Sequence, residues 1–309
     1  MIGRWLLCLV TWLASSPRAA AAAAASAHPP CVLNRWRRAY LDSSSLSRWD
    51  ATMVDVRGSS AFAGNVNATW PQAIDYRRAP GVLTSVKDQG ACGSCWAFSS
   101  AETLEGQLGL NGQSQNVSAQ NFVDCVKLDF GCGGGWMDDA LAYAEKHGVE
   151  SLADYPYTGI SQRRNQSGRL ATIRPRTYLE VPRGDAHLRE ALVTVGPVSI
   201  ALDATFAFQA YAGGVFDDST CDPTTPNHAL LLVGYDAVNR YWIVKNSWGD
   251  AWGEHGYIRI NSSVPNVCGI SSFATVAHIP PLTSVQARAR MRNRLLSVSA
   301  PAADGLHVP

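Results

Sequence analysis

One ten-residue stretch, QGACGSCWAF at residues 89–98, constrains what this chain can fold into more than any other. A glycine-rich turn leads to Cys95, and the apolar residues after it fall near helical spacing: Trp96, Phe98, Leu104 and Leu108. A cysteine at a helix N-terminus lies among backbone N–H groups that lack helical partners and at the positive end of the helix dipole. Both favour the thiolate, which is the nucleophilic form of the side chain. The stretch therefore predicts a reactive cysteine, provided that other segments supply partners for it.

The N-terminus has the pattern of a secretory signal peptide. Arg4 precedes an apolar run over residues 5–14, and seven alanines follow at residues 19–25. The apolar run is too short to cross a bilayer as a helix. We therefore expect a cleaved signal over residues 1–27, entry into the secretory pathway and no stable membrane insertion of the mature form; an uncleaved anchor is the alternative. Four Asn-x-Ser/Thr sequons also suit a secreted glycoprotein: Asn67, Asn116, Asn165 and Asn261.

Secretion changes how the eight cysteines are interpreted, because disulfides persist in oxidising compartments. Cys8 would leave with the signal, and the odd number that remains fits structural pairs plus at least one thiol. The net charge of +1 and the 17% of charged residues give no indication of a nucleic-acid partner.

The periodicity of the chain changes about halfway along. Helical patterns occupy the first half, at residues 95–108, 119–126 and 136–147. Short apolar or β-branched runs separated by turn residues occupy the second, at residues 197–202, 229–233, 241–244 and 256–260. A helical half followed by a β half predicts an α+β protein with two lobes and a site in the cleft between them.

The flanks of this region look different. Residues 28–69 are polar and irregular, and we interpret them as a short pro-segment. Residues 70–279 form the globular domain. Residues 280–309 open on two prolines and carry arginines two residues apart, which predicts a basic, disordered tail; a targeting or docking segment is the alternative.

Two segments of the β half hold groups that could serve Cys95. His228 opens one predicted strand, and Asn246 follows the next. An imidazole could take the thiol proton and return it to a leaving amine. An amide could hold that imidazole in one orientation. Gln89 could direct its side-chain N–H at a developing oxyanion beside the backbone N–H of Cys95.

At these residues the chain resembles the papain-like cysteine proteases, in particular the cathepsin L/S-like endopeptidase group. CGSCW stands at residues 92–96, with His228 and Asn246 following Cys95 by 133 and 151 residues, close to the separation of about 130–150 residues typical of the family. Further matches are the glycine turn at residues 131–135, NSWG at 246–249, Trp252-Gly253 and Cys268-Gly269. The resemblance covers about residues 70–279.

The resemblance implies a two-lobed fold with a helical N-terminal lobe and a β-barrel-like C-terminal lobe. It implies a cysteine endopeptidase acting through an acyl-enzyme. Cys95 would be the nucleophile, His228 the general acid and base, Asn246 its orienter and Gln89 the oxyanion donor. Trp248 would cover the His–Asn hydrogen bond and border the substrate on the leaving-group side.

The family's precursors are zymogens that often carry a longer, helical inhibitory pro-segment. Residues 28–69 are shorter and lack its Asn/Phe-rich pattern, so here the chain departs from the family. Members of the family work in lysosome-like acidic compartments or outside the cell.

The resemblance also implies a substrate-binding surface. Gly134 and Gly135 would pair with an extended peptide as a strand does. Five apolar residues match the pocket for the second residue before the scissile bond: Trp136, Met137, Ala201, Pro226 and Phe273. We therefore expect a preference for Leu, Val or similar residues there, with Phe273 disfavouring charged or very large groups.

Two disulfides follow from the same resemblance, Cys92–Cys132 and Cys221–Cys268, which leaves Cys95 as the reactive thiol. Cys125 matches another half-cystine of the family, but residues 155–170, where its partner is expected, contain no cysteine. We therefore expect Cys125 to be a buried thiol, with pairing to Cys31 as the alternative.

Three other interpretations remain. CGSC alone could be a redox pair or half a zinc site, but no second Cys-x-x-Cys exists. A catalytically inactive homologue could act as a binding or immunity-type protein. An exopeptidase needs a group that captures a chain terminus, and no paired-histidine insertion follows Cys132, which favours an endopeptidase. We expect no metal or cofactor, a monomer, protein or peptide substrates, and cystatin-type inhibitors as further partners.

Overall fold

The computed structural model describes residues 70–162 and 172–280 of the 309-residue chain. The expected signal at 1–27, the pro-segment at 28–69 and the tail beyond Pro280 lie outside the described residues, as do the sequons at Asn67 and Asn165. These assignments stay predictions. In the part of the chain that the structure describes, no helix is long and apolar enough to cross a membrane.

The three predicted helices of the first half are present. They are α4 (Cys95–Leu110), α5 (Ala119–Cys125) and α6 (Met137–His147). Ser118 caps α5, since its Oγ accepts a hydrogen bond from the Asn121 N–H at 3.0 Å. Gly148 ends α6 with a φ of 76°, a conformation that costs glycine little. The remaining helices are α7 (Asp185–Thr194), α8 (Phe206–Gln209) and the 3₁₀ turns η2 (Tyr76–Arg78), η3 (Gly131–Gly133) and η4 (Val267–Gly269).

The β half forms one eight-stranded sheet with the order β2-β8-β3-β5-β6-β7-β4, and β1 also pairs with β5. The strands are β1 (Ala73–Asp75), β2 (Thr177–Glu180), β3 (Val198–Leu202), β4 (Val215–Phe216), β5 (His228–Asp236), β6 (Tyr241–Lys245), β7 (Tyr257–Asn261) and β8 (Phe273–His278). Every pairing is antiparallel except β4 with β7. Among the described residues the pairing path is open at β2 and β4, so the sheet is not closed into a barrel.

The boundary between the helical and β halves is less simple than the periodicity suggests. The strand β1 lies in the helical half of the sequence, yet it crosses to pair with β5, and α7 lies in the β half. The periodicity missed four strands, β1, β2, β4 and β8, and two helices, α7 and α8. β1 and β4 are two or three residues long, too short for an alternating pattern to be read. Their positions are decided by pairing with longer strands.

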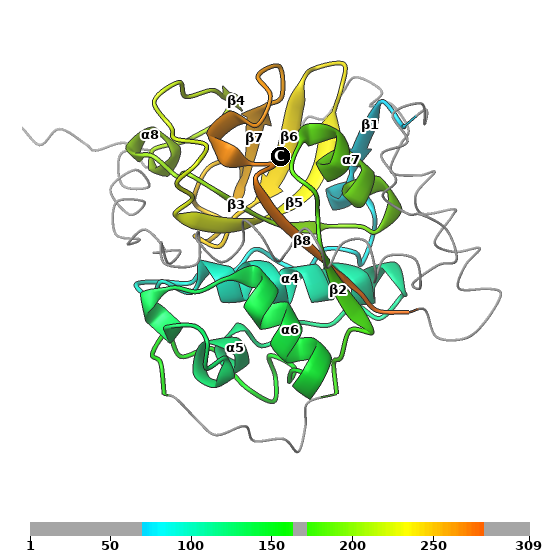
Figure 1. Cartoon of the computed structure of the whole chain (residues 1–309), viewed down its shortest axis with the longest axis vertical. Coiled ribbons are helices and arrows are strands. Elements are labelled where there is room, and N and C mark those ends of the chain that lie inside the picture. The colour runs from blue at the N-terminus through cyan, green and yellow to red at the C-terminus, as the bar shows by residue number, and fades with distance from the viewer. Residues whose placement is uncertain (1–69, 163–171, 281–309) are drawn as a thin grey trace, which may run out of the picture.

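Helix α4 lies along the boundary between the sheet and the other helices of the first half (Figure 1). One apolar core surrounds the sheet, and a second surrounds α4, α5 and α6 with small residues from the sheet: Ala201, Ala229 and Ala277. All residues of α4 are buried. Polar side chains join it to the sheet, because Ser99 Oγ donates to the Leu230 carbonyl at 2.6 Å and Thr103 Oγ1 lies 2.7 Å from Ser199 Oγ. The start of α4 is therefore fixed against the start of β5.

Candidate active site

Cys95 is the first residue of α4 and has no exposed surface. The turn before it packs against the Gly131–Gly133 turn, and the Gly93 N–H donates to the Cys132 carbonyl at 3.0 Å. A Cβ on Gly93 would lie 2.6 Å from that same oxygen, so only glycine allows this approach. The Ala229 N–H lies 3.3 Å from Cys95 Sγ. The sulfur is therefore beside the first residues of β5, which include His228.

His228 and Asn246 are hydrogen-bonded, with 2.8 Å between His228 Nε2 and Asn246 Oδ1. The Ser247 N–H donates to the same Asn246 Oδ1 at 2.8 Å, which identifies that atom as the oxygen and hence as an acceptor. Nε2 of His228 must then carry the proton in this contact. Both side chains are buried, with 1% of His228 and none of Asn246 exposed. The sequence prediction that these two residues come together is therefore matched by the geometry.

Trp248 covers this pair. Its ring is stacked on the His228 imidazole, with centroids 4.5 Å apart and planes 24° apart. Phe208 of α8 packs edge-on against Trp248 at 5.8 Å and against His228 at 6.1 Å. Only 5% of Trp248 is exposed, so these rings exclude water from the His228–Asn246 hydrogen bond and strengthen it.

Gln89 is held by the segment that carries Asn246. Its backbone N–H donates to the Ser247 carbonyl at 2.9 Å, and its Oε1 accepts from Ser247 Oγ at 2.8 Å. These contacts fix the orientation of the amide, whose Nε2 donates to the Cys92 carbonyl at 2.9 Å. An amide has two N–H groups, and this bond uses one of them. Ser247, for which the sequence predicted no role, thus orients both Gln89 and Asn246.

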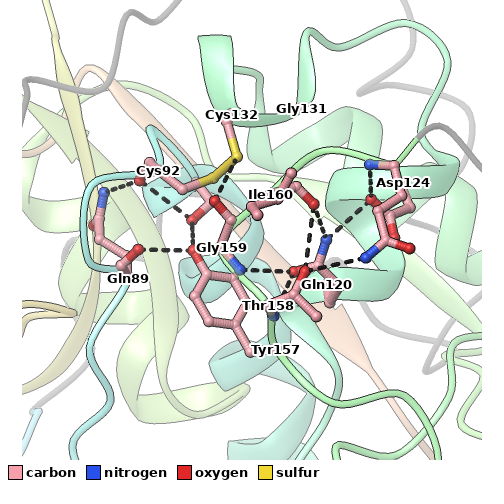
Figure 2. The surroundings of a disulfide bond; sticks show 12 residues. Gln89, Cys92, Gln120, Asp124, Gly131, Cys132, Tyr157, Thr158, Gly159 and Ile160 are labelled. Atoms are coloured by element: carbon pink, nitrogen blue, oxygen red, sulfur yellow. Dashed lines mark hydrogen bonds between the residues drawn. A yellow bond between two sulfur atoms is a disulfide. The ribbon is translucent and has the colours of Figure 1, made fainter.

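Tyr157 is a second residue whose contribution the sequence did not predict. Its hydroxyl donates to the Gln89 carbonyl at 2.8 Å and lies 2.7 Å from Ser94 Oγ (Figure 2). Burial raises the pKa of Tyr157 to about 12, although the hydrogen bond with Ser94 acts in the opposite direction. The phenol is therefore neutral at physiological pH and acts as a hydrogen-bonding strut behind Gln89. The Tyr-Pro-Tyr run at residues 155–157 was the available signal in the sequence.

Both disulfides that the resemblance implies are present, Cys92–Cys132 and Cys221–Cys268. Figure 2 shows how the first links the turn before Cys95 to the turn at Gly131–Gly133. Because Cys92 is bonded to Cys132, it can form neither a redox pair nor a zinc half-site with Cys95. Within the described ranges, no cluster of three or more His, Cys, Asp or Glu side chains could hold a metal ion.

Cys125 is buried and forms no disulfide. The described part of the segment expected to hold a partner cysteine, residues 155–162, is held to α5 by hydrogen bonds instead (Figure 2). Gln120 Oε1 accepts from the N–H groups of Thr158 and Gly159 at 2.9 and 3.2 Å. Asp124 accepts from the Gln162 N–H and the Tyr155 hydroxyl, each at 2.8 Å. These contacts hold the segment in place without a disulfide at Cys125.

The oxidation state of Cys95 differs from the expectation. The sequence analysis left Cys95 as a thiol, whereas in the structure it is disulfide-bonded. A sulfur in a disulfide cannot act as a nucleophilic thiolate. A Cys95 thiolate therefore requires reduction of this bond.

Several of the expected pocket residues lie together. Trp136 and Phe273 have ring centroids 5.4 Å apart, and Phe273 of β8 is paired in register with Ala201 of β3. Met137 belongs to the same apolar cluster. Pro226 is partly buried and lies two residues before His228, the first residue of β5.

The two glycines expected to bind a peptide backbone differ. Gly134 has both its backbone groups engaged within the turn, since its N–H lies 3.4 Å from the Gly131 carbonyl and its own carbonyl accepts from Phe130 at 2.9 Å. It is therefore poorly placed to pair with a peptide. Gly135 makes no such turn contact, and a Cβ there would lie 2.6 Å from the Trp96 ring. Gly135 is the better candidate.

Comparison with known proteins agrees with this geometry. The family model described as papain family cysteine protease matches residues 70–278. Cathepsin K of Mus musculus is 44% identical over 211 residues, which cover 66% of this chain and 64% of that protein. Cathepsin S of Mus musculus is 42% identical over 230 residues, which cover 71% of this chain and 66% of that protein.

Among solved structures, digestive procathepsin L 3 of the Tenebrio molitor larval midgut matches with a TM-score of 0.66 and 37% identity. That match covers 71% of this chain and 73% of the insect protein. The region matched to mouse cathepsin K spans 64% of that protein's length, so the comparison covers only part of each chain. Because the family model spans well over half of the chain and the fold agrees, this chain belongs to the papain family of cysteine proteases.

Proposed function

We propose that this chain is a cysteine endopeptidase in which Cys95 is the nucleophile and His228 the general acid and base. One observation carries the proposal. The start of α4 places the Cys95 sulfur 3.3 Å from the Ala229 N–H, directly beside His228, whose Nε2 is bonded to Asn246 under the Trp248 ring. A thiol next to the strand that opens with an imidazole, which is itself bonded to an orienting amide, is the arrangement expected of a catalytic triad.

Acylation begins from the reduced thiolate–imidazolium pair. The Cys95 thiolate attacks the carbonyl carbon of the scissile peptide bond, and the carbonyl oxygen takes up the negative charge. His228 then gives its Nδ1 proton to the leaving nitrogen as the C–N bond breaks. Asn246 keeps Nε2 engaged throughout, so Nδ1 is the nitrogen that exchanges protons. The products are a thioester at Cys95 and a free amine.

Deacylation reverses these roles. His228, now neutral, takes a proton from a water molecule while the oxygen of that water attacks the thioester carbonyl carbon. The C–S bond breaks, the carboxylic acid leaves and the sulfur departs as a thiolate beside the protonated imidazole. The cycle needs no oxidant, metal or cofactor once Cys95 is reduced.

Gln89 is the proposed oxyanion donor, through the second N–H of its Nε2 and together with the Cys95 backbone N–H. Replacing Gln89 with alanine should lower kcat by about 10²-fold, the usual effect of losing one oxyanion donor, with a much smaller change in KM. Steady-state kinetics check this. Ser247→Ala is the matched comparison, because it removes the group that orients Gln89 and should give a smaller fall in the same direction. An unchanged kcat in Gln89→Ala would remove Gln89 from this role.

The substrate would lie extended along Gly135, with the side chain of its second residue before the scissile bond among the pocket residues. Trp136, Ala201 and Phe273 offer an apolar surface to that side chain, with Met137 and Pro226 as further proposed lining. Leu or Val would bury apolar surface there, whereas a carboxylate or ammonium group would lose water without gaining a partner.

A peptide assay tests the proposed function. The reduced protein should cleave an internally quenched peptide with blocked termini and Leu or Val at the second position, at mildly acidic pH, and the matching Asp peptide at least about tenfold more slowly. Cleavage only of peptides with an unblocked end would indicate an exopeptidase. A reduced protein that binds the peptide without cleaving it would be an inactive homologue, and the proposal would then fail.

Further properties follow from the same proposal. The protein would pass through the secretory pathway to an acidic compartment or to the extracellular space. It would act as a monomer on protein or peptide substrates and be open to cystatin-type inhibitors. Residues 28–69 would keep it inactive until cleavage near residue 70, and N-terminal sequencing of the active form tests that boundary.

A further inference from the structure

Four charged side chains are buried beneath the candidate site. Lys245 and Glu102 have side chains only 1% and 2% exposed, and Glu105 and Lys87 are 1% and 11% exposed. We call these four residues the buried charge cluster. Two lysines and two glutamates balance in charge, which is the condition under which ions can stay buried in a protein.

Lys245 has all three of its ammonium donors occupied. Its Nζ lies 2.7 Å from Glu102 Oε1, 3.1 Å from the Thr84 carbonyl and 3.0 Å from the Ser85 carbonyl. An ammonium group can donate three hydrogen bonds, so these contacts satisfy it fully. The side chain is therefore held in one place by acceptors from two other segments of the chain.

Lys87 and Glu105 form the second half of the cluster. Lys87 Nζ lies 2.7 Å from Glu105 Oε2, 2.9 Å from Thr84 Oγ1 and 3.5 Å from Glu102 Oε1. Burial lowers the pKa of Lys87, but the Glu105 and Glu102 carboxylates outweigh it and raise the pKa above its usual value. Glu102 thus contacts both lysines and joins the two halves.

Each segment in the cluster leads to a residue of the candidate site. Lys245 is the last residue of β6 and directly precedes Asn246. Glu102 lies on α4 seven residues, or about two turns, after Cys95. Residues 84–85 lead into Gln89, whose N–H is bonded to the Ser247 carbonyl. The Lys245–Glu102 contact therefore ties the strand that positions Asn246 to the helix that positions Cys95.

Stability alone gives a weak reason for such a pair. Replacing a buried ion pair with apolar residues of similar size is often neutral or stabilising, because the charges lose their hydration. The pair does restrict geometry, because an ammonium group held by three acceptors allows the segments that carry those acceptors little displacement relative to one another. A displacement of about 1 Å in a catalytic group can cost roughly 10²-fold in rate.

We propose that Lys245 and Glu102 are positioning residues whose ion pair sets the location of Asn246, and through it of His228, relative to Cys95. The inference rests on the proposed function, because it takes its three reacting or orienting groups from there. It adds that the chain's catalytic rate depends on a buried charge pair that touches neither substrate nor the reacting atoms.

The test compares Lys245→Met, Glu102→Gln and the double variant Lys245→Met/Glu102→Met, each folded, reduced and normalised by titration of its active thiol. Lys245→Met removes the nearer ammonium partner of the buried Glu102 carboxylate and leaves only Lys87, at 3.5 Å, so the variant should be destabilised. The double variant removes both charges and should recover most of the stability, measured by urea unfolding. We expect kcat to fall roughly 10-fold or more in all three variants, with KM within about twofold.

The double variant separates positioning from mere stability, because a structural role predicts that kcat recovers together with stability. The proposal would be overturned if the stable double variant and Glu102→Gln both kept wild-type kcat. If Lys245→Met fails to fold, the kcat values of these two variants still test the proposal. Arg259→Met is the control. Arg259 lies on β7, which pairs with β6, and its Nη2 is 2.6 Å from Glu254 Oε1. The variant breaks this ion pair outside the buried charge cluster and should keep wild-type kcat. A wild-type protein that cleaves no peptide would refute the proposed function instead, whatever the variants do.

Discussion

Replacing Cys95 with serine should lower kcat by roughly 10⁶-fold, the scale of loss seen when a hydrolase loses its nucleophile. The serine hydroxyl has nearly the same shape as the thiol, but it does not ionise beside an imidazole in the way that a thiol does. The folded structure should be unchanged, because the site is closed by the Cys92–Cys132 disulfide and by the packing of α4. Steady-state hydrolysis of the Leu peptide, with enzyme at micromolar concentration to detect residual turnover, measures the effect.

Cys125→Ser is the matched control for this variant. Cys125 is a buried cysteine that forms no disulfide, and it lies at the end of α5. Its replacement should leave kcat within about twofold of wild type. Turnover by Cys95→Ser at the wild-type rate would show that another group is the nucleophile.

Replacing His228 with alanine should lower kcat by about 10⁴-fold, the upper range for loss of a general acid and base. The variant loses the proton donor for the leaving amine and the base that activates water. It also loses the cation that stabilises the thiolate, so the pH at which Cys95 ionises should rise toward that of an ordinary thiol. Steady-state kinetics give the first effect, and the pH dependence of Cys95 alkylation gives the second.

His147→Ala is the control for His228→Ala. His147 ends α6, where its ring lies 4.9 Å from that of Tyr143, away from the candidate site. This variant should keep the wild-type kcat and the wild-type alkylation profile. A His228→Ala protein with unchanged alkylation would mean that the imidazole does not stabilise the thiolate.

The sequence predicted the elements with long, clear periodicity and the residues with distinctive chemistry. The start of α4 at Cys95 and the extents of α5 and α6 were predicted to within one residue, because helical periodicity is a local property of the sequence. His228 and Asn246 could be brought to Cys95 only through the family resemblance. Local sequence does not indicate that Cys95 and His228, which are 133 positions apart, lie close together, because their distance depends on how the strands pair in the sheet.

The parts that the sequence missed depend on long-range contacts. Strand β1 is three residues long and exists through its pairing with β5. Ser247 and Tyr157 gain their roles through hydrogen bonds to Gln89 across 158 and 68 residues. Lys245 and Glu102 are charged, which normally indicates an exposed position, and their burial is explained by the long-range partners that they find in the buried charge cluster. The open sheet is likewise a property of strand pairing that alternation of side chains does not report.

The pH dependence of Cys95 alkylation tests the thiolate–imidazolium pair most directly. The protein is first reduced under conditions that leave the two structural disulfides intact, in a Cys125→Ser background, and is then treated with iodoacetamide, with the modified residue identified by peptide mapping. The pair predicts a nearly constant rate at Cys95 between about pH 5 and 8, falling at lower pH as the thiolate is protonated. A rate that rises about tenfold per pH unit up to pH 8, as an ordinary thiol gives, would contradict it.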